Sequence, residues 1–390
     1  MYRRMFIMGA GGAAWMQAAP SDQVRAGIIG PGGRGRFLMG RFLQDPAVRF
    51  TAVCDVYEPN LEAGLSAAKG SAKAYRRYHE LLSDPGVDIV VIATPEHWHA
   101  QMVLDALKAG KDVYVEKPLC HTPEEGVALM KAARASKQIV QVGMQRRSYP
   151  LYMKARDIRA EGTLGNVRLV RTWWINNSLK KGPNEKLSGP LDWEQWQGPA
   201  PRRPMDVDRF RNWRNYRDYA GGIVADQGAH IYDGIHLIRG VGFPSAVNAS
   251  AGKVHSPGGD TPETVVVAAE YPDDFLAVFT INYAGMRYPT RIDQLNQYDG
   301  DEARMDVGRE YLAVYKQAEP EKAVITDTGS FEKASDDHVR NFLDCVRTRK
   351  EPNATVEKGF QAALVIQMAN RSMDSGRRVK WNAEAQKVEF

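Results

Sequence analysis

Two residues in the second half of the chain have the types and spacing of an acid–base pair. Asp226 and His230 are four positions apart in the run DQGAH, so on a helix they share one face. A carboxylate beside an imidazole can move a proton at neutral pH, with the aspartate orienting the ring. The same pair could bind a metal or be an ordinary buried histidine, and the run alone does not decide between these readings.

A lysine in the first half could stabilise negative charge. Lys117 lies in Glu116-Lys117-Pro118, directly after the apolar run 112–115. At the carboxyl end of a parallel strand it would point into the crevice where such sheets bind ligands. The alternative is a solvated lysine in front of a helix-starting proline.

Two histidines follow another apolar run. His97 and His99 lie in the segment PEHWH, after residues 88–93. Their spacing resembles a metal pair, but no cysteine or carboxylate cluster is near in sequence, so we predict no metal. We interpret them as strand-end residues that line a cofactor pocket.

A glycine-rich turn opens this half of the chain. Gly30, Gly32 and Gly35 fit the pattern G-x-G-x-x-G between an apolar run and a helical pattern. The pattern allows a tight turn, a close approach to a pyrophosphate and close helix–strand packing, and the helix N-terminus offers free N–H groups. Asp55, at the end of the next strand, would bond ribose hydroxyls and disfavour a 2′-phosphate. The prediction is therefore NAD, with NADP less favoured.

The elements that must position these residues alternate regularly up to residue 143. Apolar runs alternate with helical stretches, which indicates a doubly wound parallel sheet. We predict strands at 24–29, 50–55, 88–93, 112–115 and 139–142, and helices at 34–44, 59–69, 99–109 and 124–135.

After residue 150 the pattern changes to an α+β domain with an open, mostly antiparallel sheet. Residues 177–220 are irregular and rich in Pro, Gly, Trp and Arg. We predict strands at 167–174, 247–252, 264–271, 276–283 and two within 303–314, and helices at 152–161, 222–239, 335–346 and 356–375. The expected division is a Rossmann domain at 21–147 and a substrate-binding and oligomerisation domain at 148–390.

Composition excludes several classes of protein. The net charge of +5 is small for 390 residues and the basic residues are scattered, which argues against nucleic-acid binding. Three distant cysteines form neither a disulfide framework nor a zinc knuckle. No apolar run reaches the roughly 18 residues that span a bilayer, so we expect no membrane insertion.

Residues 1–20 have the pattern of an export signal. Arg3 and Arg4 precede a short apolar stretch, and Ala18-Ala19-Pro20 ends it. Paired arginines suggest the twin-arginine route, which exports folded proteins to the periplasm. The alternative is a tail with two chance arginines on a cytoplasmic protein.

Four ordered motifs together resemble one enzyme family. The glycine turn, TPEHWHA (94–100), AGKDVYVEKPL (109–119) and GGIVADQGAHIYD (221–233) resemble the glucose–fructose oxidoreductase/inositol dehydrogenase/MocA family along nearly the whole chain from residue 24. Residues 191–204 and 212–222 resemble its exported bacterial subgroup. Glu96 and Gln227 depart from the residues more usual at their positions, which puts the substrate in doubt rather than the cofactor.

The resemblance implies roles for the motif residues. Lys117 would contact the reacting hydroxyl and the nicotinamide ribose, and the Lys117–Pro118 bond is typically cis. Asp226 and His230 would bind substrate hydroxyls, with His230 or Lys117 as the base. The family implies a Rossmann domain paired with an open sheet that builds homodimers or homotetramers, and sugar, cyclitol or other polyol substrates.

The expected activity is NAD-dependent oxidation of a secondary hydroxyl of a sugar, cyclitol or glycoside. The alternative is glycoside hydrolysis or elimination through transient 3-keto oxidation, against which the presence of Lys117 argues. The catalytic candidates are Lys117, Asp226 and His230, and the substrate-binding candidates are Lys117, Arg146, Trp213, Asp226 and His230. The cofactor-binding candidates are Gly30, Gly32, Gly33, Arg34, Gly35, Asp55, Thr94, Pro95, His97, His99, Glu116, Lys117 and Gln145.

Overall fold

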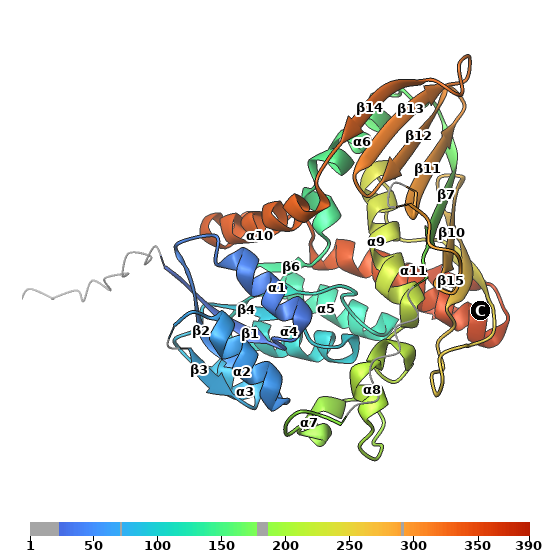
Figure 1. Ribbon diagram of the computed structural model, residues 1–390. Coiled ribbons are helices and arrows are strands. Elements are labelled where there is room, and N and C mark those ends of the chain that lie inside the picture. Colours follow the sequence, from blue (N-terminus) through green and yellow to red (C-terminus); the bar gives the residue numbers. More distant parts are fainter. Residues whose placement is uncertain (1–22, 71, 178–185, 290–291) are drawn as a thin grey trace, which may run out of the picture.

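Two β-sheets organise the molecule. The computed structural model describes residues 23–70, 72–177, 186–289 and 292–390. Figure 1 shows a first sheet wrapped by helices, a second sheet fanned out beside it, and the long helix α9 (Gly222–Arg239) between them. The predicted export signal at residues 1–20 lies outside the described residues.

The first sheet is fully parallel and has the order β3-β2-β1-β4-β5-β6. Its central strands β4 and β5 are buried at every position, as expected for a sheet covered on both faces. The predicted doubly wound sheet is confirmed. Its strands are β1 (Val24–Ile29), β2 (Val48–Cys54), β3 (Lys73–Tyr75), β4 (Ile89–Ile92), β5 (Asp112–Val115) and β6 (Val140–Val142).

Helices from both ends of the chain cover this sheet. Val339, Phe342 and Leu343 of the late helix α10 (Phe331–Thr348) share a core with Phe42 and Tyr114 of the first sheet's layer. The other covering elements are α1 (Gly33–Phe42), α2 (Glu58–Ala67), α3 (Tyr78–Ser83), α4 (His99–Lys108), α5 (Pro123–Ala135) and the 3₁₀ turns η1 (Glu96–Trp98) and η2 (Gln145–Ser148).

The second sheet has ten strands in the order β14-β13-β12-β11-β7-β10-β9-β8-β15-β16. Among the described strands of this sheet only β7 and β10 pair in parallel, so the predicted mostly antiparallel sheet is confirmed. Its strands are β7 (Val167–Ile175), β8 (Ala246–Ala251), β9 (Thr264–Tyr271), β10 (Phe275–Asn282), β11 (Gln294–Gly300), β12 (Ala303–Gly308), β13 (Tyr311–Lys316), β14 (Ala323–Thr328), β15 (Val379–Asn382) and β16 (Lys387–Glu389).

One face of the second sheet packs against α9 and α11 (Val356–Ser375), with α6 (Pro150–Ala160) beside α9. Gly228 allows this close packing, because a Cβ there would overlap Ile366 of α11 and press on Phe279 of β10. Most of α9 is buried, and its N-terminal turns are thereby fixed beside the carboxyl ends of the first sheet's strands.

The stretch predicted as irregular is a folded segment. Residues 186–219, which we call the crossing segment, contain α7 (Trp193–Gln197), α8 (Val207–Arg211) and the 3₁₀ turn η3 (Trp213–Asn215) around a small core of Trp196, Tyr216 and Tyr219. Backbone hydrogen bonds of 2.9 Å join Glu58 N–H to the Pro190 carbonyl and Asp192 N–H to the Val56 carbonyl. The crossing segment is thereby fastened to the strand end after β2.

Within the described ranges, no helix has both the length and the apolar character needed to cross a membrane.

Candidate active site

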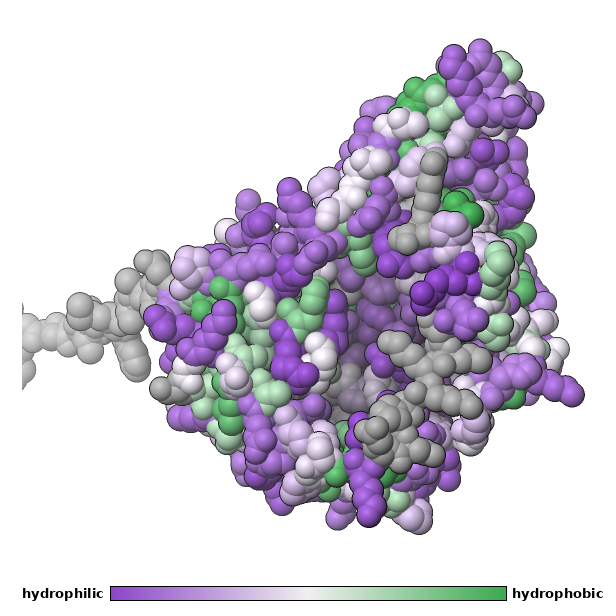
Figure 2. Space-filling model, in the orientation of Figure 1, coloured by the Kyte–Doolittle hydropathy of each residue, from purple (hydrophilic) through white to green (hydrophobic). Residues whose placement is uncertain are grey.

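A cavity of about 1260 Å³ lies where the carboxyl ends of the first sheet meet α9 and the crossing segment. Figure 2 shows this face of the molecule hollowed between the two sheets, with a largely hydrophilic floor. Pockets for single small ligands are typically about 300–1,000 Å³. The cavity therefore has room for an extended ligand and a second, smaller one.

The glycine turn forms one end of the cavity. Gly30 has φ +82°, and a Cβ there would come within 2.9 Å of the Ala93 carbonyl oxygen. Helix α1 begins at Gly33 without a side-chain cap, so its first N–H groups remain for an anion. Gly35 does not line the cavity; a Cβ at this position would overlap the Gly30 carbonyl, which is the packing role predicted for it. These features fit a dinucleotide pyrophosphate.

Asp55 lies at the next strand end and lines the same cavity. Burial raises its pKa to about 6, although its Oδ1 accepts the Tyr57 N–H at 2.8 Å. Sequence reasoning missed its neighbours Asn60, Arg76 and Arg77, which line this end too. Asp55 and its neighbours could hold the ribose of a nucleotide.

Lys117 and Asp226 meet at the other end of the cavity. The Lys117–Pro118 bond is cis, as the family resemblance implied. Lys117 Nζ donates to Asp226 Oδ1 at 2.6 Å and to the Asp226 carbonyl oxygen at 2.8 Å. Burial would raise the pKa of Asp226, but the charges of Lys117 and Arg214 outweigh it and hold this pKa well below its ordinary value. The pair is therefore an ammonium held by a carboxylate.

His230 lies one helical turn beyond Asp226 and also lines the cavity. Burial and the charges of Lys117 and Arg146 lower the pKa of His230 well below its ordinary value, so the ring is neutral at pH 7. Its Nδ1 has no hydrogen-bond partner among the described residues. The prediction that Asp226 orients the ring is wrong: the carboxylate binds the lysine cation and accepts Gln227 Nε2–H at 3.0 Å instead.

Most of the other predicted cofactor residues line the cavity between these two ends. Arg34 Nε donates to Glu116 Oε1 at 2.8 Å, which ties the glycine turn to the strand end before Lys117. The buried ring of His99 has the Pro118 carbonyl oxygen 2.7 Å from one nitrogen and the Thr94 carbonyl oxygen 2.9 Å from the other. The ring therefore connects the loop that contains Thr94 to the loop that contains Pro118. The lining residues of this group are Gly30, Gly32, Gly33, Arg34, Asp55, Thr94, Pro95, His99, Glu116, Lys117 and Gln145.

Besides Gly35, two predicted residues do not line the cavity. His97 Nε2 lies 3.1 Å from the Trp196 carbonyl oxygen, so the ring faces the crossing segment. The 3₁₀ turn η2 carries Arg146 beneath α9, where its guanidinium donates to the His230 carbonyl oxygen at 3.1 Å and to Gln294. Arg146 is 1% exposed, so its predicted contact with substrate is corrected to support of the α9 backbone.

The crossing segment forms a wall of the cavity that the sequence analysis did not foresee. Trp213 lines the cavity as predicted. Its neighbours from the same segment were missed, although the density of Trp and Arg within 177–220 was the available signal. They are Asp192, Glu194, Gln195, Trp196, Gly198, Arg202, Phe210, Arg211 and Arg214.

Comparison with known protein families agrees with this geometry. Residues 24–144 match the family described as "Oxidoreductase family, NAD-binding Rossmann fold", and residues 192–381 match "Oxidoreductase family, C-terminal alpha/beta domain". These matches define the class of protein as an NAD-binding oxidoreductase. The chain belongs to the glucose–fructose oxidoreductase/inositol dehydrogenase/MocA family.

Individual relatives are distant. Inositol 2-dehydrogenase of Rubrobacter xylanophilus is 30% identical over 164 residues, which cover 42% of this chain and 47% of the relative. The uncharacterized oxidoreductase YrbE of Bacillus subtilis is 23% identical over 369 residues, covering 92% of this chain and 97% of the relative. In the first curated matches the chain spans about half of the relative's length, 57% in one and 47% in the next.

Solved structures share the fold. Levoglucosan dehydrogenase in complex with NADH and levoglucosan superposes with a TM-score of 0.74 at 18% identity, covering 92% of this chain and 99% of that one. An oxidoreductase from Agrobacterium radiobacter in complex with NAD⁺, L-tartaric acid and magnesium has a TM-score of 0.74 at 15% identity, covering 92% and 98%.

Proposed function

We propose that this protein is an NAD-dependent dehydrogenase that oxidises a secondary hydroxyl of a sugar, cyclitol or glycoside. The observation that carries the proposal is one cavity with a dinucleotide turn at one end and Lys117, Asp226 and neutral His230 at the other. Relatives named inositol 2-dehydrogenase and levoglucosan dehydrogenase support a polyol or sugar substrate.

The residues divide the chemistry between them. When bound, NAD⁺ would supply the acceptor for the hydride on the substrate carbon that bears the hydroxyl. Neutral His230 accepts the hydroxyl proton, since its lowered pKa keeps the ring unprotonated. Lys117 donates a hydrogen bond to the oxygen and stabilises its developing charge, while Asp226 fixes the ammonium group in place.

The choice of NAD over NADP rests on Asp55. A carboxylate at the ribose end repels a 2′-phosphate and accepts hydrogen bonds from ribose hydroxyls. Arg77 lines the same end, while the side chain of Arg76 already pairs with Glu58. We expect tighter binding of NAD, which calorimetric titration of the two dinucleotides would measure.

The activity is tested by incubating the protein with NAD and a panel of sugars and cyclitols. NADH formation that disappears in Lys117→Ala, with NAD binding retained, supports the proposal. Cleavage of a glycoside without net NADH would instead favour the hydrolytic alternative. Unchanged turnover in Lys117→Ala would contradict the site assignment.

We also infer export to the periplasm from Arg3-Arg4 and the small residues that follow. A fusion of residues 1–25 to a reporter should reach the periplasm, and replacing both arginines with lysine should retain it in the cytoplasm. Export that survives this replacement would contradict the twin-arginine route.

A further inference from the structure

Arginines are concentrated on the cavity wall formed by the crossing segment. Residues 202–217 contain six of them. Three line the cavity: Arg202, Arg211 and Arg214. The remaining three, Arg203, Arg209 and Arg217, do not.

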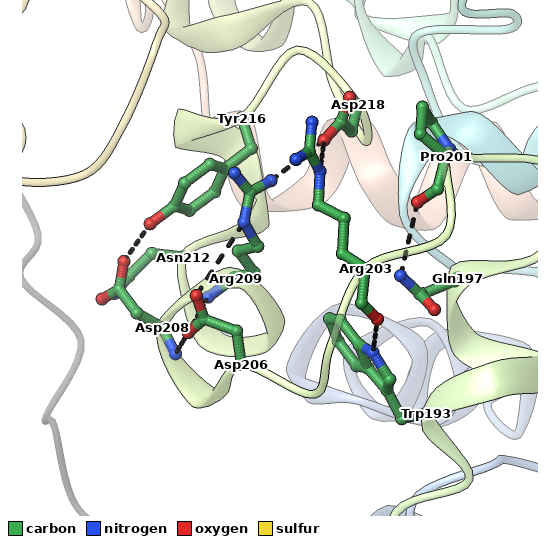
Figure 3. A network of polar contacts seen from close by, with 10 residues as sticks. All are labelled: Trp193, Gln197, Pro201, Arg203, Asp206, Asp208, Arg209, Asn212, Tyr216 and Asp218. Carbon is green, nitrogen blue, oxygen red and sulfur yellow. Dashed lines mark hydrogen bonds and ion pairs between the residues drawn. The ribbon is translucent and has the colours of Figure 1, made fainter.

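Most of these arginines pair with carboxylates outside the reacting end of the cavity. Figure 3 shows Arg203 and Arg209 converging on Asp218, at 2.6 and 3.0 Å, within a polar network that shapes the segment. Arg217 lies 3.4 Å from Asp374, and Arg202 lies 3.5 Å from Glu194. The acids of this region therefore offset the positive charge of the arginines that they contact.

Arg214 is different. Its side chain is 47% exposed and lines the cavity, and its guanidinium lies 4.1 Å from the centre of the Trp213 ring. Its ion-pair partner within the described residues is Asp226, at 3.4 Å. That carboxylate already holds Lys117 at the shorter distance of 2.6 Å.

The residues that line the reacting end of the cavity thus carry more positive than negative charge; the nearby acid Glu96 does not line it, and burial raises the pKa of Glu96 to about 7. Lys117 and Arg214 share the carboxylate of Asp226, and His230 is neutral. The nicotinamide ring of NAD⁺ would add a further positive charge. Arg211 lines the cavity as well, and its Nε is buried without a hydrogen-bond partner in the described part of the chain. A neutral sugar leaves this excess uncompensated.

We propose that the substrate is a sugar acid, whose carboxylate binds the guanidinium of Arg214 beside the Trp213 ring. This inference rests on the proposed dehydrogenase function and names its substrate class. A planar guanidinium matches a carboxylate through two parallel hydrogen bonds, and stacking on Trp213 pre-organises that geometry. Arg214 is then a specificity-determining residue, because it binds the carboxylate of the substrate whose hydroxyl reacts between Lys117 and His230.

The test compares matched pairs of sugars that differ in charge. We would measure NAD reduction with galacturonate against galactose and glucuronate against glucose, in the wild type, Arg214→Gln and Arg217→Gln. Charge-assisted hydrogen bonds predict a kcat/KM for the acid that exceeds that of its neutral partner by roughly 10- to 100-fold. Arg214→Gln should abolish this preference, and Arg217→Gln, outside the cavity, should keep it.

A binding measurement separates this inference from the proposed activity. Quenching of tryptophan fluorescence by each sugar is followed in the protein preloaded with NADH, where no turnover occurs. Quenching by the sugar acid alone that is lost in Arg214→Gln would support the inference, even if no sugar were oxidised. The absence of oxidation would overturn only the dehydrogenase proposal. Oxidation of the neutral sugar as efficiently as of the acid, or a preference that survives in Arg214→Gln, would overturn the inference alone.

Discussion

At the scale of single residues, the ion pair between Lys117 and Asp226 separates this site from a simple histidine–aspartate pair. The two residues are far apart in sequence, so the sequence indicated each of them but not their partnership. The four-residue spacing of Asp226 and His230 suggested a direct bond, yet a carboxylate near both a cation and a neutral ring binds the cation. Asp226 is therefore a positioning residue for Lys117.

Replacing Asp226 with asparagine tests this role. The lysine would lose its counter-ion and its fixed position, so we expect kcat/KM to fall by roughly 10²- to 10⁴-fold, with NAD still bound. Steady-state kinetics and dinucleotide titration measure the two effects. Asp374→Asn, which alters an exposed partner of Arg217, is the matched control. Equal losses in both variants would contradict the assignment.

Glu96 gives a prediction on pH. Its side chain is 2% exposed, and burial raises its pKa from 4.5 to about 7, although Oε2 accepts the Gly221 N–H. Because the folded-state pKa is above the unfolded one, this carboxyl's contribution to stability is present below pH 4.5 and is lost as pH rises through 7.

Glu96→Gln lacks this titration. A pKa shift of one unit corresponds to about 1.4 kcal/mol. The free energy of unfolding of the variant, relative to that of the wild type, should therefore rise by about 3 kcal/mol between pH 4.5 and pH 8. Denaturant unfolding at a series of pH values measures the difference. A constant difference across that range would contradict the buried, titrating carboxyl.

At the scale of elements, predictability followed the strength of the local pattern. Continuous apolar runs such as β4 were predicted to within a residue or so, because burial on both faces requires them. Strand β11 was missed because QLNQYDG has no apolar alternation, and its pairing with β7 and β12 is set by tertiary contacts. The short strands β3, β15 and β16 were missed for lack of length.

The crossing segment was the longest folded stretch that the sequence did not predict, because its apolar residues follow neither a helical nor a strand periodicity. Tertiary contacts hold its wall residues at the site: the Trp196 ring packs on Tyr219, and the Trp196 carbonyl accepts the Trp98 indole N–H at 2.9 Å. The segment supplies ten of the 36 residues that line the cavity, and of these ten only Trp213 was predicted.

Trp196→Ala tests the role of this segment. Trp196 is 5% exposed, and loss of a buried tryptophan typically costs about 3–5 kcal/mol. We expect a lower Tm and weaker NAD binding, because the segment covers the cavity beside Asp55. Trp193→Ala, which removes a less buried ring stacked on Trp196, should have a smaller effect on both readouts. Unaltered NAD affinity in Trp196→Ala would contradict the covering role.

At the scale of the whole molecule, no helix of the described residues covers the second face of the second sheet. Trp173, Val266 and Thr280 lie side by side on this outer face, on β7, β9 and β10, and Val266 is 43% exposed. The opposite face carries the core against α9 and α11. We propose that the outer face joins copies of the chain into a homodimer or homotetramer.

Light scattering coupled to size-exclusion chromatography checks this proposal. We expect a dimer or tetramer in the wild type and a smaller species in Val266→Glu, because a charge in a buried interface is costly. Val254→Glu, at an exposed loop position, should leave the mass unchanged. A monomeric wild type would contradict the proposed assembly.

The proposed reaction transfers a hydride to nicotinamide from the carbon that bears the reacting hydroxyl, between Lys117 and His230. It is tested most directly by incubating the protein and NAD with perdeuterated sugars, sugar acids and inositols, and analysing the recovered nicotinamide by mass spectrometry. We expect one deuterium in the reduced nicotinamide, and its loss in Lys117→Ala. Reduced nicotinamide without deuterium, or no reduction with any of these substrates, would contradict it.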